Sequence, residues 1–181
     1  MSELLIAKSV VKALIKQKKS ICVAESITGG GLGQVLTQIP GSSKVFVGGV
    51  IAYSDDLKVS ELGVSKSDLK KYTAVSEEVA ISMAKGALKK FKTDFAVATT
   101  GVAGPGAAYG QKAGTAWIGV ASKKEAFAIN LSLPGKRDVI RHALVIIACR
   151  ITSRLPARER LIAKASFLLA TPIQAVPAFW P

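Results

Sequence analysis

The sequence feature that most constrains the fold is a short apolar run followed by a glycine-rich turn and an amphipathic segment. Residues 21–24 are typical of a buried strand, and residues 25–31 combine polar side chains with three consecutive glycines. An apolar stripe at helical spacing follows, made up of Leu32, Val35, Leu36 and Ile39. A strand that enters a helix through such a turn leaves main-chain N–H groups free at the helix N-terminus, where phosphate or a developing oxyanion is favoured.

Ser26 lies in this turn, where its hydroxyl would be exposed at the end of the strand. It is therefore a candidate site residue. The alternative is that Ser26 and Thr28 only cap the helix, since hydroxyl side chains are common at that position. The N–H groups of residues 28–31 could stabilise an oxyanion or bind phosphate, and the sequence leaves both open.

The rest of the chain alternates between predicted helices and strands. Helical spacing predicts helices over residues 2–18, 55–62, 65–72, 76–91 and 136–155. Apolar runs predict strands over residues 45–54, 94–100, 114–122 and 126–133, the last two forming an antiparallel hairpin. Because helices and strands alternate early and the hairpin comes late, we expect an α/β fold, a three-layer α/β/α sandwich on a mixed sheet.

A second glycine-rich loop, residues 101–106, follows the predicted strand 94–100. In open α/β sheets, ligand sites form beyond the carboxyl ends of the strands. The loops after Ala24 and Ala98 both lie at such ends. If they converge, they would form a site for a small molecule.

The composition is that of one domain with enough apolar material for a core, because 49% of the 181 residues are hydrophobic. No run reaches the roughly 20 apolar residues of a membrane span, and residues 1–3 do not begin a signal sequence, so we expect a cytoplasmic protein without a membrane partner. Cys22 and Cys149 fit buried, reduced thiols. The single histidine, His142, excludes a His-rich metal centre and a Ser–His hydrolase unless it is itself the base.

The net charge of +13 raises the question of a nucleic-acid partner. The lysines are spread over separate predicted helices, and few aromatic residues lie between them to stack on bases. Solvated helix faces therefore explain the charge better than nucleic-acid binding. A basic surface would still attract a phosphorylated substrate.

Several motifs along residues 5–155 carry a resemblance to a known family. They include Ala24-Glu25-Ser26-x-Thr28-Gly29-Gly30, Pro40-Gly41-Ser42-Ser43, Tyr53-Ser54-x-x-x-Lys58, Thr100-Gly101-Val102-Ala103-Gly104-Pro105 and Gly135-x-Arg137. In these motifs the chain resembles the CinA C-terminal-domain family, whose enzymes are nicotinamide mononucleotide deamidases. The resemblance implies hydrolysis of the carboxamide of nicotinamide mononucleotide to nicotinate mononucleotide and ammonia. It also implies an α/β fold, no metal or other cofactor, and a homo-oligomer.

The resemblance implies catalytic roles for three residues. Ser26 matches the family nucleophile, and Lys58 matches its activator. A lysine acts as a base only if its pKa falls from about 10.4 towards neutrality. The alternative is a solvated Lys58 on a helix face. Tyr53 could position Ser26 or Lys58 or stack on the pyridinium ring, with ordinary packing as its alternative.

The substrate-binding residues implied by the resemblance are Thr28, Gly29, Gly30, Ser42, Thr100, Gly101, Arg137 and Arg141. Arg137 matches the family's substrate-contacting arginine, and a guanidinium binds phosphate or carboxylate through paired hydrogen bonds. Arg141, one turn further, either assists Arg137 or is solvated. Thr100 has a strand-end hydroxyl as its alternative. Glu25 either orients a neighbour or closes a structural ion pair, and we favour the structural role.

The chain departs from the family pattern on its substrate side. Thr73 stands where glycine is usual, and the loop of residues 104–114 lacks the usual paired glycines and has Ala113 where proline is common. Residues 1–156 form the predicted amidohydrolase domain. Residues 157–181 form a predicted appendage that either packs on a neighbouring subunit or has no role. The alternative function is a non-enzymatic module of the competence/damage-inducible type that binds a nucleotide or a protein.

Overall fold

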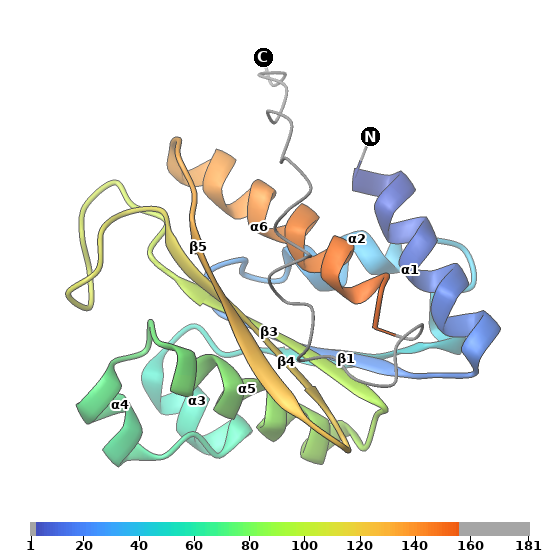
Figure 1. Ribbon diagram of the computed structural model, residues 1–181, viewed down its shortest axis with the longest axis horizontal. Coiled ribbons are helices and arrows are strands. Elements are labelled where there is room, and N and C mark those ends of the chain that lie inside the picture. Colours follow the sequence, from blue (N-terminus) through green and yellow to red (C-terminus); the bar gives the residue numbers. More distant parts are fainter. Residues whose placement is uncertain (1–2, 156–181) are drawn as a thin grey trace.

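A computed structural model describes residues 3–155 of the chain as five strands and the helices that cover them (Figure 1). The strands are β1 (Ile21–Glu25), β2 (Phe46–Ile51), β3 (Phe95–Gly101), β4 (Thr115–Ser122) and β5 (Ala126–Ser132). They form one sheet in the order β2-β1-β3-β4-β5. β1 is parallel to both β2 and β3, whereas β4 is antiparallel to β3 and to β5. The mixed sheet and the late hairpin confirm the prediction from the sequence.

The helices lie in two layers, one on each face of the sheet (Figure 1). They are α1 (Glu3–Gln17), α2 (Gly31–Thr37), the short 3₁₀ helix η1 (Ser42–Lys44), α3 (Asp55–Leu62), α4 (Lys66–Tyr72), α5 (Glu77–Phe91) and α6 (Arg137–Thr152). One face is covered by α1, α2 and α6 and holds the larger apolar cluster. The other is covered by α3, α4 and α5 over a smaller cluster. The fold is therefore the expected three-layer α/β/α sandwich.

The helix α5 packs centrally on its face of the sheet because small residues let the two main chains approach. A Cβ added to Gly119 of β4 would lie 2.1 Å from the carbonyl oxygen of Ala80 in α5. The side chain of Ser76 caps this helix by accepting a hydrogen bond from the N–H of Val79 (3.3 Å), as the sequence predicts. A larger residue at position 119 would push the helix off the sheet.

The arrangement of β1 and β3 brings the two glycine-rich loops together. The two strands are parallel neighbours with Glu25 opposite Thr99, so both end at the same edge of the sheet. At the other edge, the Asp94 carboxylate accepts hydrogen bonds from the Lys19 ammonium (2.8 Å) and the Ser20 N–H (2.9 Å), which ties the starts of both strands together. The predicted convergence of the loops is confirmed.

Most boundaries differ from the sequence prediction by one residue, the last helix ends three residues early at Thr152, and two differences lie near the site. Glu25 is the last residue of β1 and not part of the turn. The strand predicted over residues 45–54 ends at Ile51, because residues 52–54 carry the chain to α3 and the Ser54 side chain caps that helix.

Among residues 3–155, no helix has both the length and the apolar character needed to cross a membrane. The predicted appendage, residues 157–181, lies outside the described residues.

Candidate active site

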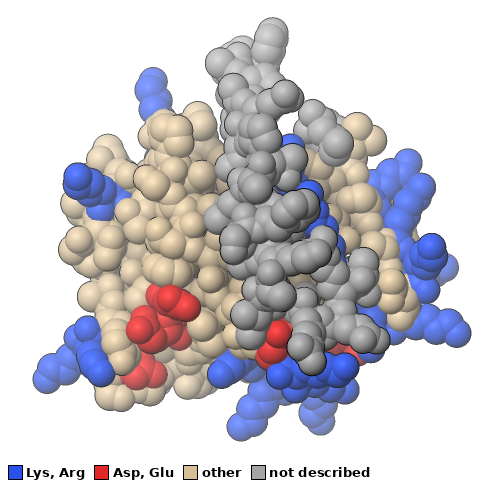
Figure 2. Space-filling model, in the orientation of Figure 1, with Lys and Arg blue, Asp and Glu red and all other residues tan. Residues whose placement is uncertain are grey.

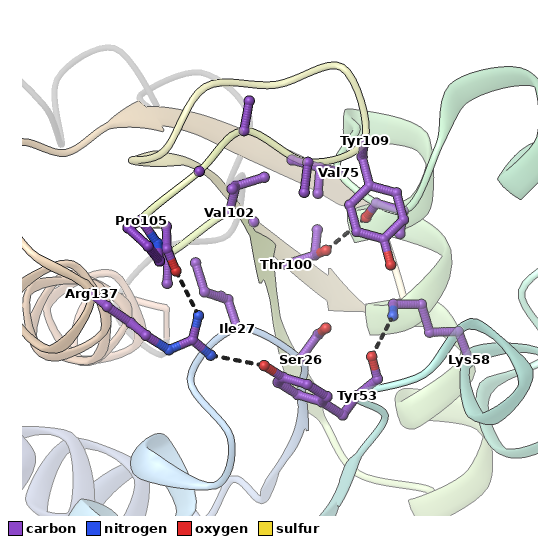
Figure 3. A pocket seen from close by; sticks show the side chains of 17 residues that line it. Ser26, Ile27, Tyr53, Lys58, Val75, Thr100, Val102, Pro105, Tyr109 and Arg137 are labelled. Carbon is purple, nitrogen blue, oxygen red and sulfur yellow. Dashed lines mark hydrogen bonds between the residues drawn. The ribbon is translucent and has the colours of Figure 1, made fainter.

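Ser26 is held at the carboxyl edge of the sheet by the strand that precedes it. Its main-chain N–H donates a hydrogen bond to the carbonyl of Thr99 (2.9 Å), which continues the ladder between β1 and β3 by one residue. The residue is only 8% exposed, and its side chain points into a hollow (Figure 3). Its hydroxyl has no hydrogen-bond partner among the described residues. The hydroxyl is therefore free to act on a ligand in the hollow.

The glycine turn after Ser26 is capped from inside by Glu25. This buried carboxylate accepts hydrogen bonds from the N–H groups of Gly30 (2.9 Å), Leu32 (3.0 Å) and Gly33 (2.8 Å). The N–H of Gly29 donates to the carbonyl of Ser26, and that of Gly31 donates to the carbonyl of Thr28. From the sequence, we expect the N–H groups of residues 28–31 to hold an oxyanion or phosphate. For Gly29 to Gly31 this is wrong, because these donors are already used, whereas the N–H of Thr28 has no partner among the described residues. The structural role favoured for Glu25 is confirmed, although it caps main-chain donors and forms no ion pair with any residue of the described range 3–155.

The alternative role of Ser26 and Thr28 as helix caps is also wrong. The N-cap of α2 is Gly30, which makes no side-chain capping bond. The Thr28 hydroxyl instead shares a buried hydrogen bond of 2.7 Å with the hydroxyl of Thr99. Thr28 thus pins the turn to β3 and does not line the hollow.

Arg141 holds the same turn through its carbonyl groups. Its Nε donates to the carbonyl of Ile27 (3.0 Å), and its Nη2 donates to the carbonyl of Thr28 (2.9 Å). The guanidinium also packs close to Gly29, where an added Cβ would lie 3.0 Å from Nη2. Neither of the two predicted alternatives describes Arg141 fully, because it is partly buried and bound to the main chain that directly follows Ser26.

Lys58 is buried against the hollow, although lysines are among the residues most often exposed. It lies in α3, is 1% exposed, and lines the same hollow as Ser26 (Figure 3). Its Nζ donates to the carboxylate of Asp55 (3.2 Å) and to the carbonyl of Tyr53 (3.4 Å). The alternative of a solvated Lys58 on a helix face is therefore wrong.

The hollow has a volume of about 300 Å³ and is open on one side. Its walls come from both glycine-rich loops, from the start of α3, from the segment before α5 and from the start of α6. Ser26, Tyr53, Lys58, Thr100, Gly101 and Arg137 are the predicted site residues that line it. A space of this size suits one small ring with a substituent.

Tyr53 and Arg137 close one side of the hollow together. The Arg137 guanidinium donates to the Tyr53 hydroxyl (2.9 Å) and to the carbonyl of Gly104 (2.9 Å) (Figure 3). Tyr53 is 58% exposed, so ordinary core packing does not explain its position. Through these two hydrogen bonds, Arg137 in the first turn of α6 links the segment after β2 to the second glycine-rich loop.

Thr100 lines the hollow and connects two segments of the chain through its hydroxyl. Its hydroxyl donates to the carbonyl of Ala74 (2.6 Å), which joins β3 to the segment before α5. The neighbouring residue, Gly101, continues β3 and brings the second loop to the rim. Thr100 is thus more than a strand-end hydroxyl.

Some predicted site residues are not brought into this hollow. Gly29 and Gly30 lie in the turn behind Ser26, and Arg141 borders a second, adjoining hollow of about 620 Å³. Ser42 begins η1, directly before β2, and therefore lies near the amino ends of the parallel strands, at the opposite edge from Ser26. Ser42 is not among the described residues that line the hollow.

Two residues of the site were not found by sequence reasoning. Asp55 is the ion-pair partner of Lys58, and Tyr109 lines the hollow from the second loop. Burial raises the pKa of Tyr109, and the nearby Asp55 and Tyr53 add to that rise. Asp55 looked like an ordinary acidic residue in a first helical turn. The signal for Tyr109 was the tyrosine itself, in a loop otherwise rich in glycine and alanine.

The remaining candidate groups lie elsewhere. His142 is exposed on α6, with its Nδ1 3.5 Å from the carboxylate of Glu3. Cys22 and Cys149 are free, buried thiols. Burial raises the pKa of Cys22 to about 11, against a smaller lowering by the hydroxyl of Thr93, and burial raises the pKa of Cys149 to about 12. Within the described part of the chain, no three His, Cys, Asp or Glu side chains are grouped to hold a metal ion.

The basic side chains are distributed in several separate groups on the face shown in Figure 2. Tan surface and some acidic side chains lie between these groups. This agrees with lysines on the solvent sides of separate helices, as the sequence indicates.

Comparison with known proteins identifies relatives of the whole described unit. A family model described as the CinA C-terminal domain matches residues 4–155. A CinA-like protein of Gloeothece citriformis is 42% identical over 161 residues, which are 86% of this chain and 37% of that protein. The chain spans a little over a third of the length of the curated relatives it matches.

Solved structures show the same fold. A competence-damaged protein (CinA) superfamily protein from Klebsiella pneumoniae superposes with a TM-score of 0.84 at 27% identity, covering 87% of this chain and 99% of that one. The competence/damage inducible protein CihA from Agrobacterium tumefaciens gives a TM-score of 0.82 at 30% identity, covering 87% and 98%.

Proposed function

This chain belongs to the CinA C-terminal domain family, and from that premise we propose that it hydrolyses the carboxamide of nicotinamide mononucleotide. The products are nicotinate mononucleotide and ammonia. The observation that carries the proposal is that the free hydroxyl of Ser26 and the buried amine of Lys58 line one hollow of about 300 Å³. A nucleophile and a proton acceptor in one small cavity are what amide hydrolysis needs.

In the proposed reaction, Oγ of Ser26 attacks the carboxamide carbon and its proton passes to Nζ of Lys58. Lys58 then returns the proton to the amide nitrogen as the C–N bond breaks, so that the tetrahedral intermediate collapses to an ester on Ser26 and ammonia leaves. Water then hydrolyses the ester formed on Ser26. Asp55, which accepts a hydrogen bond from Nζ of Lys58 (3.2 Å), stabilises the ammonium that forms in the intermediate.

The oxyanion of that intermediate needs hydrogen-bond donors. The amides of Gly29 to Gly33 are used by other groups, so they cannot serve. The N–H groups of Ile27 and Thr28 have no partner among residues 3–155. We assign the oxyanion to the N–H of Ile27, the one of these two residues that lines the hollow and the one that directly follows Ser26.

The phosphate of the substrate fits the adjoining basic hollow. Lys136, Arg137 and Arg141 border it, and Arg137 also lines the hollow of Ser26. A mononucleotide extending from one hollow to the other would therefore place its carboxamide near Ser26 and its phosphate near the guanidinium groups.

The test is to incubate the purified chain with nicotinamide mononucleotide and measure both products, ammonia and nicotinate mononucleotide, in equal amounts. Nicotinamide riboside, which lacks the phosphate, is the matched comparison and should react more slowly. If the chain released ammonia from neither nicotinamide mononucleotide nor nicotinamide riboside, the proposal would be contradicted.

A second candidate function is favoured by the ion pair of Lys58 with Asp55 (3.2 Å), because it places a basic group in the hollow that can bind an anionic ligand. In that case the chain is a module that binds a nucleotide without turning it over. Binding of nicotinamide mononucleotide with no ammonia release would support this candidate.

A further inference from the structure

The segment between β3 and β4, residues 102–114, carries a tight two-residue hairpin turn beyond the second glycine-rich loop. Ala108 and Gln111 form an isolated bridge in which each N–H donates to the other's carbonyl, at 3.1 and 2.9 Å. The two residues between them, Tyr109 and Gly110, have φ values of +55° and +70°. Positive φ at both central positions defines a type I′ turn.

Tyrosine is an unfavourable choice for the first central position of such a turn. Asparagine, aspartate or glycine is preferred there, because a residue with a bulky side chain is strained at positive φ. The strain is not offset by packing in the core, since Tyr109 is 48% exposed. Strained residues that the fold does not require are often held for function.

The strained turn places the ring of Tyr109 at the hollow. The hydroxyl of Tyr109 points towards Lys58 (Figure 3). Tyr53 lies across the hollow from Tyr109, with Ser26 and Lys58 between the two rings in this view. Both rings line the hollow, and they come from separate parts of the chain, the loop before β4 and the segment after β2.

We infer that Tyr109 is a specificity-determining residue, whose ring packs with Tyr53 against a flat, positively charged aromatic ring of the ligand. Electron-rich faces of tyrosine attract a cationic ring, and aromatic stacking is tolerant of substituents. This inference rests on the proposed function, in which that ring is the pyridinium of nicotinamide mononucleotide. The reduced, uncharged form of the same mononucleotide should bind less well.

The experiment measures ligand binding by calorimetry in the Ser26→Ala background, where no turnover occurs. Tyr109→Asn removes the ring but supplies a residue that type I′ turns prefer, so its melting temperature should be equal or higher. We expect this variant to bind nicotinamide mononucleotide about tenfold more weakly, and to lose most of the preference for the oxidised over the reduced form. Tyr109→Phe keeps the ring and should stay within about twofold of the parent.

Steady-state kinetics with Ser26 present give an independent readout. Tyr109→Asn should raise KM with little change in kcat, because the ring contacts the ligand away from the reacting carbon. Unchanged affinity and unchanged preference in Tyr109→Asn would overturn the assignment of Tyr109 alone. No binding of nicotinamide mononucleotide to the Ser26→Ala parent would overturn the proposed function together with this inference.

Discussion

Glu25 and Arg141 hold the two halves of one turn. The Glu25 carboxylate accepts hydrogen bonds from the N–H groups of Gly30, Leu32 and Gly33. The Arg141 guanidinium donates hydrogen bonds to the carbonyls of Ile27 and Thr28, which directly follow Ser26. Each charged side chain thereby satisfies main-chain groups of the opposite polarity. The turn that carries the proposed nucleophile is rigid because both sets of groups are used.

Glu25→Gln should lower stability, because one amide oxygen cannot replace a carboxylate that accepts three main-chain N–H groups. Hydrogen bonds to a buried charge are worth more than neutral ones, so we expect the free energy of unfolding to fall by about 2 kcal/mol. Chemical denaturation measures this loss. Glu77→Gln, in the exposed first turn of α5, is the control and should change stability by less than about 0.5 kcal/mol. Equal effects of the two substitutions would contradict the role of Glu25.

Arg141→Lys should lower kcat more than it changes KM. A lysine cannot hold two carbonyls at once with a planar fork, so the main chain beside Ser26 would lose its fixed geometry. We expect kcat of Arg141→Lys to fall about tenfold or more. A second variant, Arg141→Ala, should lose kcat as well and recover part of it when guanidinium ion is added. Arg150→Ala, at the far end of α6, is the control. A change confined to KM would indicate that Arg141 contacts substrate and does not position the turn.

Thr73→Gly should stabilise the chain. Thr73 follows α4 with φ +68° and ψ 166°, a conformation that is essentially restricted to glycine, and its hydroxyl is buried without a partner in the described part of the chain. Relief of both should raise the free energy of unfolding by about 1–2 kcal/mol. Thr73→Ala removes the hydroxyl and the γ-methyl but keeps a Cβ at this backbone conformation, so it should give a smaller gain. A loss of stability in Thr73→Gly would show that this strain is absent.

Cys22 and Cys149 should resist thiol reagents in the folded chain at pH 8. Their pKa values are raised to about 11 and about 12, so the reactive thiolate is scarce, and both side chains are buried. The folded state therefore keeps these protons when the unfolded chain loses them, and stability falls as the pH rises from about 9 towards 11. Labelling of both thiols in denaturant, but not before it, is the expected result. Fast labelling of the native chain would contradict it.

The fold could be predicted from the sequence because each element carried its own local signal. The apolar periodicity gave the helices and strands, and hydroxyl residues such as Ser65 and Ser76 marked the helix starts that the structure confirms. The order of a strand and a glycine turn also predicted that two loops would meet, since parallel neighbours end at one edge.

The site was harder to predict because side-chain partners depend on contacts distant in sequence. Lysines are abundant in this chain, so the burial of Lys58 could not be recognised without its fold. The prediction that the glycines of the turn bind an anion was wrong, because the Glu25 carboxylate already accepts hydrogen bonds from the N–H groups of Gly30, Leu32 and Gly33. Tyr109 was missed because its position depends on the backbone of a two-residue turn.

The measurement that tests the central claim most directly is ammonia release by Ser26→Ala and Lys58→Met beside the control Ser43→Ala, an exposed serine near the opposite edge of the sheet. Each of the two site variants should lose at least about 10³-fold in kcat while the control keeps native activity, and removing both groups should cost little more than removing one. Native rates in either site variant, with nicotinamide mononucleotide as substrate, would contradict the account.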